Sequence, residues 1–169
     1  MRIIGTLSAA TLLISGGVAA APTAQAADDE LAINGTYRAT SIGGWAKTND
    51  QYHDEATVVS TWTITSTCTN AQVCDGTVTS DQGWSAPLTV RDGVLWKVAH
   101  DVPNWEKCAD GSSYPGHQLY FFYPVDAYGQ QQIGSATLAG FDKTVGPSGA
   151  CGRNQSLVIE MPFRLDRIT

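Results

Sequence analysis

The clearest pattern in the sequence is the strict alternation of side chains over residues 57–68. One face carries Val58, Ser60, Trp62, Ile64, Ser66 and Cys68, whereas threonines occupy almost all of the other face. A period of two with β-branched residues throughout is typical of a half-buried β-strand. We therefore predict a strand whose Val-Trp-Ile face lies in the core and whose threonine face meets solvent or a polar lumen.

The last segment, residues 157–166, alternates as cleanly. Its apolar face consists of Leu157, Ile159, Met161, Phe163 and Leu165, and the other face is mostly polar. This pattern predicts a second half-buried strand. Pro162 has no backbone N–H to donate, so we expect the strand either to lie at a sheet edge or to open a pairing at that point.

Further strands are predicted between these two. They cover residues 36–42, 76–80, 86–91, 94–99, 117–125 and 135–141. Asp92-Gly93 separates two of them and predicts a hairpin, because Gly tolerates the positive φ of a type I′ turn. The best helical candidate is a short turn over residues 49–56, where Asn49 or Asp50 could act as a cap.

About seven or eight short strands without crossover helices predict an all-β fold with an antiparallel sheet in mainly meander order. Such a sheet closes its core either as a small β-barrel or as a sandwich. The two-faced strands and the hairpin order favour the barrel.

Residues 1–26 have the features of a secretory signal peptide. Met1-Arg2 is a positive start, residues 3–21 are apolar and uncharged, and Ala24-Gln25-Ala26 is a small-x-small cleavage pattern. We therefore expect a mature chain that begins at Ala27 and forms a single β domain over residues 27–169, secreted to the extracellular space or the cell wall.

The charge balance excludes several classes of partner. The 169 residues include 10 Lys+Arg and 16 Asp+Glu, and removing Arg2 with the signal peptide takes the net charge from −6 to −7. An acidic chain without a basic block is not expected to bind nucleic acid or anionic membranes. No later apolar run approaches the ~18–20 residues that span a bilayer. We expect a soluble monomer.

Four cysteines in an exported chain predict two disulfides. Of the three possible pairings we favour Cys68–Cys74 with Cys108–Cys151, because a five-residue loop between strand-like runs separates the first two. The rival interpretation is a metal site. The sequence has no C-x-x-C, and none of its three His lies at ligand spacing from a Cys, so we expect neither a metal nor another cofactor.

Several motifs in the later half resemble a known group of proteins. They are Asp101-Val102-Pro103-Asn104-Trp105-Glu106-Lys107-Cys108, Gly116-His117-Gln118, Phe122-Tyr123-Pro124-Val125, Cys151-Gly152 and Met161-Pro162-Phe163-Arg164-Leu165. Together they resemble small exported proteins of mycobacteria and related actinobacteria, a likeness that implies export and an envelope setting but no activity. Gly35-Thr36-Tyr37 before a β meander also resembles lipocalin-like barrels, which bind small apolar ligands, although their Gly-x-Trp would have Trp in place of Tyr37.

Three tryptophans are the candidate ligand-binding residues. Trp62 and Trp96 lie in strand-like runs and are interpreted as core, whereas Trp45, Trp84 and Trp105 lie in loop-like surroundings. A loop Trp can offer a flat face to a sugar or a protein partner. The alternative is that each of the three folds back to cover an end of the barrel. This is the more frequent arrangement for any one Trp, because large aromatic side chains are mostly buried.

No catalytic residues are predicted. His53-Asp54-Glu55 and His100-Asp101 place imidazoles beside acids, but neighbours in a strand point to opposite faces, so adjacency does not indicate a dyad. No Gly-x-Ser-x-Gly elbow occurs. A deep cleft that brings together a His, a carboxylate and a hydroxyl would instead favour the hypothesis of a hydrolase.

The leading hypothesis is a non-catalytic binding module for a small apolar or glycan ligand in the cell envelope. The alternative is an envelope domain that contacts another protein, in a structural or sensor-like role, and has no small-molecule site. An internal cavity of about 300 Å³ would favour the first, and a filled interior with an exposed apolar patch would favour the second.

Overall fold

The structure is a computed structural model that describes residues 30–91 and 93–169. The predicted signal peptide, the predicted start of the mature chain at Ala27, and Asp92 of the predicted turn lie outside the described residues.

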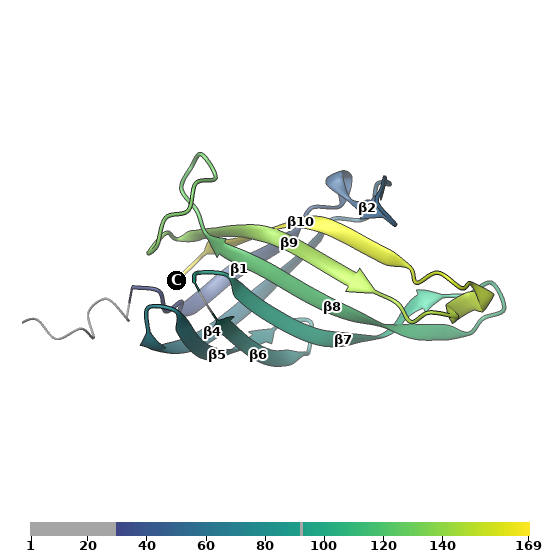
Figure 1. Ribbon diagram of the computed structural model, residues 1–169, viewed down its shortest axis with the longest axis horizontal. Helices are drawn as coiled ribbons and strands as arrows, with labels where there is room; N and C mark the ends of the chain where they lie inside the picture. The colour runs from purple at the N-terminus through teal and green to yellow at the C-terminus, as the bar shows by residue number, and fades with distance from the viewer. Residues whose placement is uncertain (1–29, 92) are drawn as a thin grey trace, which may run out of the picture.

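Eight long strands form a closed antiparallel barrel (Figure 1). They are β1 (Gly35–Ser41), β4 (Val58–Asn70), β5 (Val73–Ser80), β6 (Ser85–Arg91), β7 (Trp96–Lys107), β8 (Ser113–Pro124), β9 (Thr137–Val145) and β10 (Val158–Arg167). Each long strand pairs with the next in sequence, and β1 pairs with β10 to close the cylinder. The predicted all-β meander is confirmed, and of the two predicted architectures the chain adopts the barrel.

A short hairpin replaces the helical turn that was predicted over residues 49–56. β2 (Lys47–Thr48) and β3 (Gln51–Tyr52) pair with each other, and β2 also extends β10. Asn49 and Asp50 join them with positive φ angles of 48° and 65°. Two consecutive positive φ values define a type I′ turn, which Asn and Asp adopt more readily than most residues. The predicted helical turn is therefore wrong, since Asn49 and Asp50 form the turn of a hairpin instead.

Pro162 does not mark a sheet edge, because β10 has partners on both sides. It does mark a change of partner. β1 pairs with β10 as far as Phe163, and β2 takes over at Glu160. The backbone N–H of Ile42 donates to the Pro162 carbonyl at 2.8 Å, so the missing N–H of Pro162 faces the point where β1 ends.

The barrel interior contains side chains from alternate positions, as the period of two predicted. Trp62 and Ile64 of β4 are buried while Thr63 between them is exposed, and Met161, Phe163 and Leu165 of β10 are buried. Trp62 and Trp96 are 1% and 0% exposed, which confirms them as core residues.

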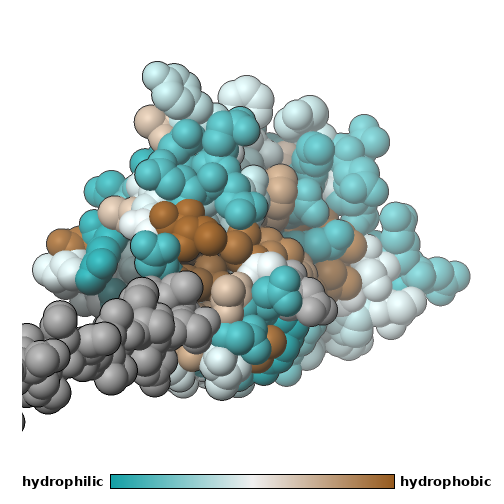
Figure 2. Space-filling view, turned by 60° about the vertical axis from the view of Figure 1, so that its left-hand side comes forward, coloured by the Kyte–Doolittle hydropathy of each residue, from teal (hydrophilic) through white to brown (hydrophobic). Residues whose placement is uncertain are grey.

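The two ends of the barrel are built differently. Residues before β1 fill one end, where Leu31 and Ile33 are buried and the Ser66 hydroxyl donates to the Ile33 carbonyl at 2.8 Å. Figure 2 turns this filled end toward the viewer and shows an apolar area bounded by polar side chains. The connections after β1, β5, β7 and β9 lie at the opposite end, which we call the cavity end because the barrel interior is hollow there.

Both predicted disulfides are present. Cys68–Cys74 joins β4 to β5 near the filled end. Cys108–Cys151 joins the tip of the β7–β8 hairpin to the 3-10 turn η2 (Ala150–Gly152) in the connection between β9 and β10. The longer disulfide therefore fastens together two of the four connections at the cavity end.

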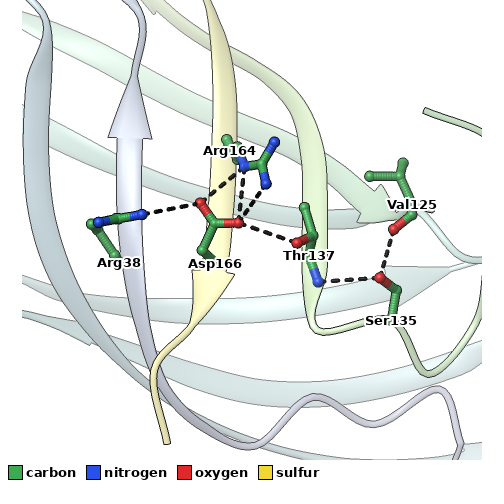
Figure 3. A network of polar contacts seen from close by, with 6 residues as sticks. All are labelled: Arg38, Val125, Ser135, Thr137, Arg164 and Asp166. Atoms are coloured by element: carbon green, nitrogen blue, oxygen red, sulfur yellow. Dashed lines mark hydrogen bonds and ion pairs between the residues drawn. The ribbon is translucent and has the colours of Figure 1, made fainter. Parts of the chain in front are cut away.

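A polar network on the outer surface crosses the strands where the barrel closes (Figure 3). Asp166 of β10 lies opposite Arg38 of β1 and Thr137 of β9 in the register. Arg38 approaches the carboxylate at 3.8 Å, Arg164 at 2.8 Å, and the Thr137 hydroxyl donates to it at 3.1 Å. The network thus connects three neighbouring strands around the seam.

Candidate ligand-binding cavity

The cavity end contains a hollow of about 300 Å³ that opens between the connections. Its walls come from β4, β7, β8, β9 and β10, with the segment before β4 and the β5–β6 turn at the rim. The lining residues are Glu55, Ala56, Val58, Gln82, Val102, Trp105, Gln118, Tyr120, Asp142, Thr144, Ile159 and Met161. The wall is therefore partly apolar and aromatic and partly polar, as in most small-molecule sites.

The strand register aligns the lining residues of β8, β9 and β10 in two rows. Tyr120 of β8 lies opposite Asp142 of β9, and Asp142 lies opposite Met161 of β10. One step nearer the mouth, Gln118, Thr144 and Ile159 are aligned in the same way. Because side chains alternate along each strand, both rows point into the barrel.

Asp142 is a buried carboxylate, with an exposed fraction of 1%. One oxygen accepts a hydrogen bond from the Ser41 hydroxyl at 2.6 Å, and the other accepts one from the Gln118 amide at 2.7 Å. Both donors are neutral. Burial raises the pKa of Asp142 above its ordinary value, and the two hydrogen bonds only partly oppose that rise.

An aromatic stack separates the cavity from the apolar core. The Trp84 ring lies parallel to the His100 ring with centroids 4.0 Å apart, and Tyr120 lies beside them, with its ring nearly parallel and its centroid 6.1 Å from that of His100. Trp62 meets Trp84 and Tyr120 edge to face from the core side. Desolvation lowers the pKa of His100. Burial, together with the charge of Asp142, raises that of Tyr120.

Two glycines make room for the Trp105 ring. A Cβ at Gly116 would lie 2.7 Å from this ring and 2.6 Å from the Thr144 methyl group, and a Cβ at Gly146 would lie 3.3 Å from the ring. Trp105 lies within a break in the β7–β8 pairing, directly after Asn104, which has a positive φ of 54°. The irregularity turns Trp105 inward over glycine backbone, so that its ring forms part of the cavity wall.

Glu55 lies at the rim and is held by local contacts. Its Oε1 accepts a hydrogen bond from the Thr48 hydroxyl at 3.2 Å and lies 3.0 Å from His53 Nδ1. The Glu55 backbone N–H donates to the Gly43 carbonyl at 3.1 Å. A Cβ at Gly43 would lie only 2.0 Å from the Glu55 carbonyl oxygen, so glycine is required for this approach.

The three candidate tryptophans all come from the cavity end but have different surroundings. Trp105 lines the cavity, and Trp84 covers the core next to it. Trp45, in the 3-10 turn η1 (Gly43–Trp45), is 65% exposed on the outside of the barrel. There it borders a shallow hollow with Tyr52 and Phe141, which are 72% and 53% exposed. The fold thus places Trp105 in the cavity wall, Trp84 against Trp62 and Tyr120, and Trp45 apart from both on the outer surface.

Two histidines pair with acids other than their immediate neighbours in the sequence, and His53 lies against Glu55 rather than Asp54. Asp101 pairs with His117 at 2.8 Å on the exposed outer face, not with its neighbour His100, which points inward. Within residues 30–91 and 93–169, no hydroxyl is hydrogen-bonded to a histidine ring. The same residues contain no cluster of three or more His, Cys, Asp or Glu that could hold a metal.

Sequence reasoning missed the polar half of the cavity. The predicted strand stopped at Phe141, so Asp142 was left in a connection. A signal was present, since Leu138, Gly140, Asp142 and Thr144 follow one period-two face that begins with a core residue. Gln118 follows the same rule in β8, where it shares a face with Tyr120 and Phe122.

No family model matches the chain, and no curated protein sequence matches it. Its structure is similar to that of the sensor domain of PknI from M. tuberculosis, solved in its monomer form. The match has a TM-score of 0.54 and 18% sequence identity, and it covers 88% of this chain and 90% of the other. At this identity the likeness establishes a shared fold, in which an all-β domain recurs in a mycobacterial protein.

The part of the chain that the structure describes contains no helix with the length and apolar character needed to cross a membrane.

Proposed function

We propose that this chain is an exported, non-catalytic binding domain that takes a small ligand into the cavity end of its barrel. The observation that carries the proposal is the cavity of about 300 Å³, whose wall contains the aromatic rings of Trp105 and Tyr120 and the buried carboxylate of Asp142. Pockets that combine apolar walls with a few fixed polar groups are typical of ligand sites.

Two further observations support the proposal. The disulfides at both ends fit an oxidising compartment, as expected after export. The structural neighbour bears the name of a sensor domain, which agrees with binding rather than catalysis. We further propose a setting in the extracellular space or cell wall, in agreement with the signal-peptide pattern at residues 1–26.

The test is a titration of the mature protein with sugars, fatty acids and small amines, followed by tryptophan fluorescence and thermal shift. Ala56→Trp, at the mouth, narrows the cavity, and Ala71→Trp makes the same change in the β4–β5 turn at the filled end. A compound that shifts wild type and Ala71→Trp but not Ala56→Trp supports the cavity as the site. Flat titrations across all three classes would contradict the proposal.

A second candidate function rests on the outer surface. Trp45, Tyr52 and Phe141 are large exposed side chains around one hollow, a feature found where proteins meet partners. An envelope interaction domain would use this patch to hold a partner protein. Cosedimentation with isolated envelope fragments would test it, because a Trp45→Ala/Phe141→Ser variant should lose binding that the cavity variant Ala56→Trp keeps.

A further inference from the structure

The charged side chains that line the cavity are all acidic. Glu55 lies at the rim and Asp142 in the wall, and the described lining residues include no Lys, Arg or His. A low-dielectric hollow with charges of one sign concentrates ligands of the opposite sign. A carboxylate or phosphate ligand would be repelled by this wall.

Asp142 has hydrogen-bond donors but no cation. The ion pairs among the described residues do not include it, and its two donors, Ser41 and Gln118, are neutral. Each carboxylate oxygen has a second lone pair that can accept a further hydrogen bond. A buried carboxylate without a counter-charge is costly, and a ligand that brings the counter-charge recovers part of that cost.

A second buried carboxylate, that of Glu106, lies near the Trp105 ring. Glu106 is 4% exposed, and its Oε2 has no hydrogen-bond partner among the described residues. A Cβ placed at Gly146 would be 2.6 Å from this oxygen and 3.3 Å from the Trp105 ring, so the carboxylate and the ring adjoin. The cavity end therefore contains three separate acids, two of them almost fully buried.

The apolar part of the wall suits the same kind of ligand. Trp105 and Tyr120 contribute aromatic rings, and Met161 contributes a polarizable thioether. Aromatic faces attract cations through the ring quadrupole as well as packing against apolar groups.

From this arrangement we infer that the cavity takes a protonated amine carried on a small apolar or aromatic body. The ammonium group pairs with Asp142, and the body lies against Trp105 and Met161. This inference rests on the proposed function and names the ligand class of the same site.

Proton release on binding is a second property that distinguishes an amine ligand from a neutral one. Burial raises the pKa of Asp142, and an ammonium group beside the carboxylate would lower it again, so binding should release protons when the pH lies between the pKa of the free protein and that of the complex. The other titratable groups around the site are Tyr120 on β8, His100 and Glu106 on β7, and Glu55 at the rim. A neutral ligand of the same shape should release none through Asp142.

The experiment compares three probes of similar size: 2-phenylethylamine, 2-phenylethanol and 3-phenylpropionate. Calorimetry at several pH values from about pH 4 to pH 8, in two buffers of different ionisation enthalpy at each pH, measures both affinity and proton release. We expect the amine to bind about tenfold or more tightly than the alcohol, and the carboxylate to bind most weakly. Asp142→Asn should remove the amine preference and the proton release, whereas Asp101→Asn, on the exposed outer face, should change neither.

The outcomes separate the inference from the proposed function. If the alcohol or the carboxylate binds as tightly as the amine, or if Asp142→Asn keeps the preference, the inference is overturned and the cavity remains a binding site. If these probes fail while a sugar or fatty acid binds, the ligand class is wrong. If no compound binds at all, both proposals are wrong. Thermal melts of each variant establish that it is folded.

Discussion

Replacing Asp142 with asparagine should stabilise the protein at neutral pH, although it changes a residue with two hydrogen bonds. Asparagine has nearly the same shape. The Gln118 amide can still donate to its oxygen, and the Ser41 hydroxyl can accept from its new N–H group. The substitution therefore removes a charge buried to 99% and retains the contacts.

The size of the effect follows from two opposing contributions. A buried ion loses several kcal/mol of solvation. Hydrogen bonds to a charged group contribute about 1.5–3 kcal/mol each, against about 1 kcal/mol for neutral ones, so the carboxylate recovers much of that loss. We expect Asp142→Asn to gain about 1–2 kcal/mol near pH 7, which corresponds to a rise in Tm of about 3 °C or more.

The gain should depend on pH in a defined direction. Because burial raises the pKa of Asp142 in the folded state, its carboxyl holds a proton after the unfolded chain has lost it. The stability that this proton contributes is present below the unfolded pKa and is lost as the pH rises through the folded pKa. Wild type should therefore lose stability with rising pH relative to Asp142→Asn.

Urea unfolding of both proteins from about pH 4 to pH 8 measures this difference, with Asp101→Asn as the exposed control. The two curves should separate as the pH rises. Parallel curves, or an Asp142→Asn protein that is less stable than wild type at pH 7, would refute the reasoning.

Three further changes have expected results. Removing the longer disulfide with Cys108→Ser/Cys151→Ser should cost about 4 kcal/mol in urea unfolding, against about 2.4 kcal/mol for the shorter one, and equal losses would contradict the loop-length argument. Gly116→Val should displace the Trp105 ring, which a shift of the fluorescence spectrum toward longer wavelength would report, while an unchanged spectrum would mean that the ring does not depend on this glycine. Asp166→Ala should cost only about 1 kcal/mol in thermal unfolding, because the network at the seam is partly exposed, and a loss above about 3 kcal/mol would show that closure depends on it.

The barrel strands could be predicted because alternation is a local property of the sequence. The threonine face of β4 and the apolar face of β10 define which side chains are buried without reference to any partner strand. Asn49-Asp50 could not be assigned in the same way. These side chains suit both a helix N-cap and a type I′ turn, and the choice depends on β10, whose Val158 N–H donates to the Asn49 side chain at 2.8 Å.

The candidate site was predicted only in part. Their loop surroundings predicted that Trp84 and Trp105 lie at the ends of the barrel. That both lie at the same end depends on the direction of the strands that carry them, which the sequence pattern does not give. Asp142 stands between Phe141 and Lys143 and resembles a solvent-facing charge when the sequence is considered alone. Its burial depends on the closure of β1 against β10, which brings Ser41 to its side across a separation of 101 residues.

The different construction of the two ends has a consequence for how this protein could change over time. The filled end and the tryptophan-rich core form the apolar cluster, to which Tyr120 alone of the described cavity-lining residues belongs. Substitutions around the mouth, at positions such as Gln82 or Ala56, should therefore change the shape of the cavity while the barrel remains folded. One scaffold could in this way serve a series of related proteins that differ in what they hold and hardly at all in how they fold.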